Sequence, residues 1–255
     1  MNRIFYVGAV LLFLTSCFDS TNSGKDKYTE YVTKQHSSDT TISEMFKNGD
    51  FSNSIFFNEI TFKDGQSNRA AISFVMRIDT SNYLVSAKHL LGPDGGFKDS
   101  LKTDNISEIL SSWKLNSLDK TINFTVNTND ITKNDGDVLI FNSIIGGENL
   151  KSFKLTKLIL PTTMDGKFDL KNSQSIFYLV GYLPSGKEVL HDLTLAGKYQ
   201  EYFVFKKNKE FDYHGLCGGP ILDNKGNVFG ILTGGLDDNG KELVLATRIR
   251  PRDLK

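Results

Sequence analysis

The residue of this chain that most needs a chemical explanation is Cys217. It lies in the glycine-rich loop Gly215-Leu-Cys-Gly-Gly-Pro220, and the residues after this loop are typical of a hairpin. Glycine neighbours offer little apolar surface, so a packing role for the thiol is the weaker interpretation. A thiol becomes a strong nucleophile once a neighbouring base removes its proton. The loop therefore indicates a candidate nucleophile.

Two other segments carry the groups that such a nucleophile requires. The apolar run Tyr83-Leu-Val-Ser-Ala-Lys-His89 places a histidine where a strand is expected to end. The run Asp137-Val-Leu-Ile-Phe141 places an acid at the start of another strand. A histidine can take the proton of a thiol, and a carboxylate can orient that histidine. Asp135 lies close to Asp137 in the sequence, so the choice of acid is less secure than the other two assignments.

The N-terminus has the three-part layout of an export signal. Met1-Asn-Arg3 is positively charged, an apolar run extends from Ile4 to Leu14, and small residues lead to Cys17. The apolar run is too short for a permanent transmembrane helix, which needs about 20 residues. Leu14-Thr-Ser-Cys17 resembles the lipobox of bacterial lipoproteins, which implies cleavage before Cys17 and a lipid on its sulfur. The alternative is an ordinary signal peptide with a chance cysteine.

The two cysteines and the polar segment after the first one predict how the chain is organised. If Cys17 carries lipid, Cys217 is a solitary thiol in an oxidising compartment, where cysteines usually form disulfides. We expect a signal peptide over residues 1–16, a lipidated N-terminus and flexible tether over 17–45, and one folded domain over 46–255. The expected location is the bacterial cell envelope, with the chain held to a membrane by its lipid.

The folded part is predicted to be all-β. Its short β-rich runs are separated by Gly, Asn, Asp and Pro clusters, a pattern typical of sandwiches and barrels. The predicted strands are 54–62, 70–78, 82–86, 121–126, 137–142, 152–160, 175–183, 188–195, 201–205, 227–233 and 242–247. Helices are expected only at 42–48, at 106–113 and in the turn 87–91.

Three motifs resemble those of chymotrypsin-like peptidases. Gly215-Leu-Cys-Gly-Gly-Pro220 is similar to that family's Gly-Asp-Ser-Gly-Gly-Pro loop with sulfur in place of the hydroxyl. Ser-Ala-Lys-His89 and Asp137-Val-Leu-Ile are similar to its histidine and aspartate segments, in the same order. The resemblance implies two six-stranded antiparallel β-barrels with His89, Asp137 and Cys217 in the cleft between them.

The same resemblance implies roles for further residues. The N–H groups of Gly215 and Cys217 would form the oxyanion hole, and the substrate strand would pair with the edge at 233–235. The implied substrate-binding residues are Phe211, His214, Thr233 and Gly234, although His214 has an equally good interpretation as a solvent-facing loop residue. Phe211 stands where trypsin-type members carry an acid, which argues against selection of Arg or Lys.

Composition and spacing argue against several other classes of protein. Lys+Arg and Asp+Glu both number 30, so no basic excess is available for a nucleic acid. No His/Cys cluster has zinc spacing, and we expect neither a metal nor a cofactor. Segments 181–188 and 235–242 match the glycine and lysine spacing of a P-loop but end in Glu, so hairpin turns are expected there. His36 and His191 have no context that suggests a role.

The sequence therefore predicts a membrane-anchored cysteine endopeptidase that hydrolyses peptide bonds through a thioester. We expect a protein or peptide substrate and a monomeric chain. Two alternatives remain open, because a fold does not fix a function. One is a binding protein that has lost turnover, and the other is a thiol esterase or acyltransferase with the same three residues.

Overall fold

Short strands make up most of the described chain. The computed structural model describes residues 42–47, 51, 53–69, 71–92, 106–117, 121–132, 136–142, 150–156, 176–182 and 188–250. The predicted signal peptide, Cys17 and His36 lie outside the described residues. The helical elements are α2 (Ile42–Lys47), η2 (Lys88–Leu91) and α3 (Ile106–Ile109).

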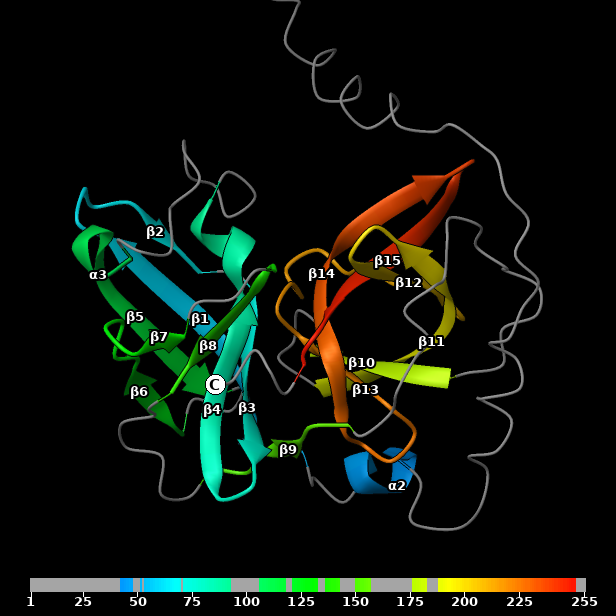
Figure 1. The fold of residues 1–255 in the computed structure, drawn as a ribbon, viewed down its shortest axis with the longest axis horizontal. Coiled ribbons are helices and arrows are strands. Elements are labelled where there is room, and N and C mark those ends of the chain that lie inside the picture. Colours follow the sequence, from blue (N-terminus) through cyan, green and yellow to red (C-terminus); the bar gives the residue numbers. More distant parts are fainter. Residues whose placement is uncertain are drawn as a thin grey trace, which may run out of the picture.

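The N-terminal half is a nine-stranded sheet, drawn in blue to green in Figure 1. Its strands are β1 (Ile55–Phe62), β2 (Ser67–Asn68), β3 (Ile72–Ile78), β4 (Ser81–Ala87), β5 (Leu110–Ser117), β6 (Asn123–Thr125), β7 (Ile131–Thr132), β8 (Val138–Phe141) and β9 (Phe153–Lys154). The main path runs β6-β5-β1-β3-β4-β8-β7, with β2 on β1 and β9 on β3. All pairs are antiparallel except β3 with β9.

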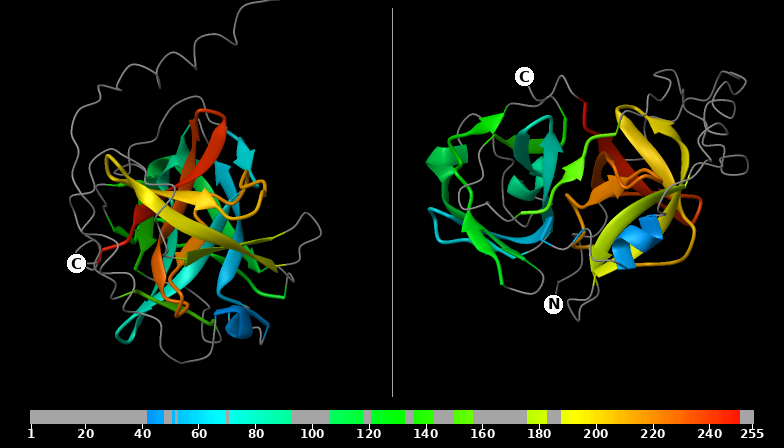
Figure 2. Two further views of the ribbon diagram at one scale, coloured as in Figure 1. Left: turned by 90° about the vertical axis from the view of Figure 1, so that its right-hand side faces the viewer. Right: turned by 90° about the horizontal axis from the view of Figure 1, so that it is seen from below.

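The C-terminal half is a closed antiparallel barrel in the order β10-β11-β12-β15-β14-β13. Its strands are β10 (Ile176–Tyr182), β11 (Glu188–Tyr199), β12 (Tyr202–Lys207), β13 (Pro220–Leu222), β14 (Val228–Asp238) and β15 (Lys241–Arg248). Aromatic side chains fill its interior, including Phe177, Phe205 and Phe229, whose ring centroids lie 5.1 to 6.1 Å apart. Figure 2 shows the two halves side by side, with α2 at one end of the barrel.

The all-β prediction is confirmed, and the six-stranded barrel of the C-terminal half is the one expected. The N-terminal half has more strands than the six expected for it, because the short pairings of β2, β7 and β9 add to the main path. Both segments with P-loop spacing are hairpins: Tyr182 pairs with Glu188, and Asp238 pairs with Lys241.

The helix expected at 106–113 is wrong over its second half. It ends at Ile109, and β5 begins at Leu110. In β5 the side chains of Leu110, Trp113, Leu115 and Ser117 are buried, and the strand pairs with β1 along nearly its whole length. Long-range pairing with β1 therefore overrides the local helical pattern, as tertiary contacts often do.

One short segment connects the two halves. Phe153 in β9 pairs with Met76 of β3, while Thr156 donates its N–H to the Val228 carbonyl in the barrel at 2.8 Å. The Thr156 hydroxyl also donates to the buried carboxylate of Asp223 at 2.5 Å. Segment 153–156 therefore contacts both sheets and is one of the links that hold the two halves together.

A single hydrophobic core extends through both halves. It contains Phe74 and Val85 from the first sheet together with Ile231 and Leu232 from the barrel. None of the helices in the described ranges combines the length and the apolar character needed to cross a membrane.

Candidate active site

His89 lies where β4 ends and the short helix η2 begins. The end of β4 is attached to β3 by Ser86, whose hydroxyl donates to the Ile72 carbonyl at 3.2 Å. The backbone N–H of His89 donates to Oδ1 of Asp137 at 2.8 Å. The His89 side chain is 15% exposed, so the ring is shielded on most sides but remains accessible.

Asp137 reaches His89 because β4 and β8 are neighbours. Ala87 pairs with Val138, and Lys88 donates its N–H to the Asp137 carbonyl at 3.0 Å. Oδ2 of Asp137 lies 2.5 Å from Nδ1 of His89. This contact fixes the ring and leaves Nε2 for another partner. Asp135, the alternative acid, lies outside the described residues.

Cys217 lies in a loop of the barrel that docks on the first sheet. The Cys217 carbonyl accepts a hydrogen bond from the Ile72 N–H at 2.8 Å. Gly218 has a φ of +81°, and a Cβ there would lie 2.2 Å from the Ile72 carbonyl oxygen and 3.1 Å from the Ala87 nitrogen. Only glycine therefore allows the loop to approach β3 and the end of β4 this closely.

The structure brings His89, Asp137 and Cys217 together. Burial lowers the pKa of His89, but hydrogen bonds and electrostatic interactions with the side chains of Asp137 and Cys217 outweigh burial and raise this pKa from 6.5 to about 10. The imidazole is consequently protonated at neutral pH. A protonated ring between a carboxylate and a thiol is suited to stabilising a thiolate.

Two backbone N–H groups beside the thiol have no hydrogen-bond acceptor among the described residues. In the loop, the N–H groups of Leu216, Gly218 and Gly219 all donate to backbone carbonyls, at 2.8 to 3.0 Å. By contrast, the N–H groups of Gly215 and Cys217 make no hydrogen bond with the described part of the chain. Gly215 has a φ of +80°, which favours glycine at this turn. These are the two N–H groups that the sequence suggested for an oxyanion hole.

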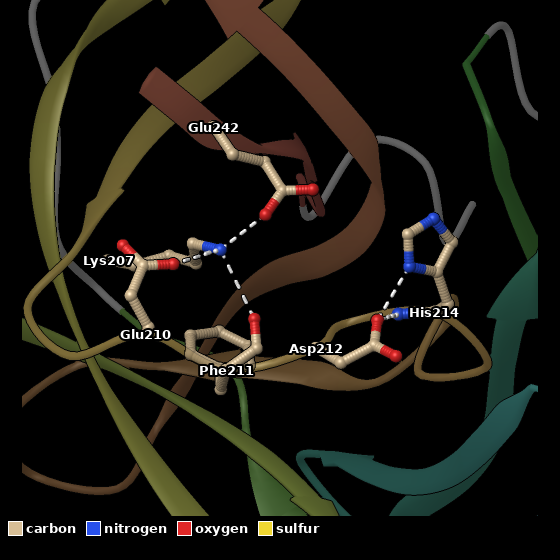
Figure 3. A network of polar contacts seen from close by, with 6 residues as sticks. All are labelled: Lys207, Glu210, Phe211, Asp212, His214 and Glu242. Carbon is tan, nitrogen blue, oxygen red and sulfur yellow. Dashed lines mark hydrogen bonds and ion pairs between the residues drawn. The ribbon is translucent and has the colours of Figure 1, made fainter. Parts of the chain in front are cut away.

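Phe211 lies in a cluster of rings and charges behind the loop. Its ring stacks on His191, with centroids 3.9 Å apart and planes at 13°. Its carbonyl accepts a hydrogen bond from Nζ of Lys207 at 3.2 Å. Figure 3 shows this lysine between the carboxylates of Glu210 and Glu242.

The other residues suggested for substrate binding are in different surroundings. His214 is 77% exposed, and its Nδ1 lies 2.6 Å from Oδ1 of Asp212 (Figure 3), so it has the solvent-facing position that the sequence also allowed. The Thr233 hydroxyl donates to the Leu245 carbonyl at 3.3 Å, and Gly234 pairs with Leu245 of the neighbouring strand β15. A role in substrate binding stays a prediction for all of them.

The sequence analysis did not single out Lys207, Tyr213 or Glu242. The first of these could have been found, because Phe203, Phe205 and Lys207 alternate along β12, and their common face points inward. The Lys207 side chain is 2% exposed, although lysine is seldom buried without charged partners. Its contacts with Tyr213 and Glu242 depend on segments far apart in sequence.

No three His, Cys, Asp or Glu side chains in the described ranges gather closely enough to hold a metal ion.

Comparison with known proteins gives only distant structural similarity. No protein-family model and no curated sequence matches the chain. A human pathogenic astrovirus serine protease matches with a TM-score of 0.49 and 13% identity, over 80% of this chain and 93% of that one. Two structures of the HtrA-type protease AlgW with a tripeptide match with TM-scores of 0.49 and 0.48 and 12% identity, over 77% of this chain and 56% of theirs. At these values the comparisons assign neither a family nor a reaction to this chain.

Proposed function

We propose that this chain is a chymotrypsin-like cysteine endopeptidase. The observation that carries the proposal is the arrangement of His89 between Asp137 and Cys217, with a pKa of about 10 that depends on both partners. Both partners raise this pKa against the burial of the ring, which lowers it. The contact of His89 with Cys217 as well as with Asp137 supports a catalytic role beyond that of a structural ion pair.

Acylation starts from a thiolate and an imidazolium. The Cys217 sulfur attacks the carbonyl carbon of the peptide bond and forms a tetrahedral intermediate. The imidazolium of His89 then gives its proton to the leaving nitrogen, the C–N bond breaks, and an amine departs. The product on the enzyme is a thioester of Cys217, and His89 is left neutral.

Deacylation reverses these roles. Neutral His89 accepts a proton from a water molecule while the water oxygen attacks the thioester carbon. The C–S bond then breaks, the acid product leaves, and the thiolate and imidazolium are restored. Asp137 stays ionised throughout and holds Nδ1, so that Nε2 faces the reacting atoms.

The N–H groups of Gly215 and Cys217 stabilise both tetrahedral intermediates in this mechanism. Donors in such positions contribute most when charge develops on the carbonyl oxygen, and losing one costs about 100-fold or more in turnover. Among the described residues, Gly234 and Gly235 pair only with β15, which leaves the edge of β14 beside Cys217 open to a substrate strand.

The test is cleavage of a peptide library, with the cut sites identified by mass spectrometry. We expect the wild-type chain to cut peptides and Cys217→Ala to cut none. Thioester substrates tested in parallel separate the alternatives. Thioester turnover without peptide cleavage indicates an esterase or acyltransferase, and binding without either reaction indicates a protein that only recognises its partner.

We propose further that the mature chain is exported and attached to a membrane through lipid on Cys17. The support is the Leu14-Thr-Ser-Cys17 sequence and the polar segment that follows it. Membrane fractionation of cells tests this directly: wild type should be found with the membranes, and Cys17→Ala should be found in the soluble fraction. Equal distribution of the two chains would contradict the lipid anchor.

A further inference from the structure

The nucleophile loop and strand β14 are hydrogen-bonded to each other next to Cys217. Gly218 donates its N–H to the Leu232 carbonyl at 2.8 Å, and Leu232 donates its N–H to the Gly219 carbonyl at 2.9 Å. Beyond Leu232 the strand pairs with β15, away from the loop. Segments 213–217 and 233–235 therefore lead away from one shared point, with Cys217 next to it. The region between these two segments is called the wedge below.

Tyr213 crosses this wedge from one side to the other. A Cβ built on Gly235 would lie 1.7 Å from Oη and 2.4 Å from Cζ of Tyr213. The hydroxyl end of the ring therefore occupies the volume that any side chain at position 235 would fill. The Leu216 N–H donates to the Tyr213 carbonyl at 3.0 Å, so the same residue also leads directly into the nucleophile loop.

Two charged side chains hold the tyrosine in this position. Burial raises the pKa of Tyr213 to about 12, and a hydrogen bond to the side chain of Glu242 adds to the effect. Glu242 is in turn paired with Nζ of Lys207, which is also 3.0 Å from Glu210 (Figure 3). Nζ of Lys207 lies 5.8 Å from the centre of the Tyr213 ring. The ring is therefore held by Glu242, which Lys207 holds in turn.

The same cluster offers little attraction to a charged substrate side chain. The positive charge of Lys207 already faces two carboxylates, and its side chain is 2% exposed. An acidic side chain would thus approach an excess of negative charge. A basic side chain would have to share the Glu242 carboxylate with Lys207 and Tyr213, which already contact it.

We propose that Tyr213 limits the size of the substrate residue whose carbonyl is attacked, so that the site takes Gly, Ala or Ser there. The attacked carbonyl must lie at the N–H groups of Gly215 and Cys217, and the side chain next to it then enters the wedge that Tyr213 crosses. This inference rests on the proposed peptidase function and specifies which substrate residues that function accepts.

The test uses peptidyl fluoromethyl ketones that differ only in the residue next to the warhead, Ala or Phe. The readout is the rate of covalent labelling of Cys217, measured by mass spectrometry of the intact chain. Wild type should react with the Ala probe about tenfold faster than with the Phe probe, or more. Tyr213→Ala should remove or reverse this preference by accelerating the Phe probe.

Two further variants make the result specific. Tyr199→Ala makes the same substitution in the β11 strand, outside the Lys207, Glu242 and Tyr213 network, and should keep the wild-type preference. Glu242→Gln weakens the support of the ring without removing it, and should raise the Phe-probe rate even if Tyr213→Ala does not fold.

Equal labelling rates for the two probes in wild type would overturn the inference. A wild-type preference for the Ala probe that persists in Tyr213→Ala would also overturn it. If Tyr213→Ala does not fold, the same criterion applies to Glu242→Gln. If neither probe labels Cys217 while iodoacetamide does, the proposed peptidase function fails and this inference fails with it. The two failures are therefore distinguishable in one set of reactions.

Discussion

At His89, two opposing physical effects meet in one side chain. Burial disfavours the charged ring, whereas Asp137 and Cys217 favour it, and the partners prevail. A protonated ring at this position is compatible with the thiolate–imidazolium pair that the proposed mechanism starts from. The ring therefore contributes to stability as well as to the proposed chemistry.

The raised pKa of His89 predicts how stability changes with pH. The folded chain holds this proton up to about pH 10 and the unfolded chain only up to about 6.5. The stabilisation is therefore complete below pH 6.5 and is lost as the pH rises through 10. Wild type should have a higher free energy of unfolding than His89→Ala at low pH. This difference should decrease across the range by an amount on the order of a few kcal/mol. Urea denaturation of both chains across the range measures it, and a constant difference would contradict the raised pKa.

The two glycines of the nucleophile loop predict different costs for the same substitution. Both have positive φ, but a Cβ at Gly218 would meet the Ile72 carbonyl, while a Cβ at Gly215 would meet nothing within 4 Å. Gly215→Ala should cost about 1 to 2 kcal/mol from backbone strain alone. Gly218→Ala should cost about 3 kcal/mol or more, because the loop must also leave β3. Thermal denaturation of the two variants measures these costs. Equal costs would contradict the close approach of Gly218 to β3.

At the scale of elements, segment 153–156 predicts a specific loss of stability. Thr156→Val keeps the shape of the side chain but removes the hydrogen bond to the buried Asp223 carboxylate, at an expected cost of about 1 to 3 kcal/mol. Thr194→Val is the matched control, because its hydrogen bond to Asn208 is exposed, and should change stability by less than about 0.5 kcal/mol. The denaturant midpoints of the two variants measure these costs. Similar shifts in both variants would argue against segment 153–156 as a stabilising link between the two halves.

Elements with strong local signals were predictable, and elements made by distant pairing were not. The β-rich runs between Gly, Asn, Asp and Pro clusters predicted β1, β3 and β10 to within a few residues of their bounds. β5 was predicted in part as a helix, since its strand form depends on pairing with β1. β13 was expected only as part of the hairpin after the Cys217 loop and was given no bounds, since it is three residues long. The side chains of His89, Asp137 and Cys217 could be proposed from their motifs, whereas the cluster at Lys207 required the closed barrel.

At the scale of the whole molecule, the continuous core predicts that the two halves unfold together. Trp113, the only tryptophan, is fully buried in the first sheet and reports on that half by its fluorescence. Its unfolding transition should coincide with the loss of far-UV circular dichroism, which reports on both halves. A fluorescence transition at a clearly different denaturant concentration would show that the halves are independent.

The most direct measurement is the rate at which iodoacetamide alkylates Cys217 at neutral pH, followed on the Cys217 peptide by mass spectrometry. Folded wild type should react faster than the same chain unfolded in urea, because His89 stabilises the thiolate. In His89→Ala this advantage should disappear, with a rate lower by about tenfold or more. Equal rates in wild type and His89→Ala would contradict activation of Cys217 by His89 and with it the proposed enzyme.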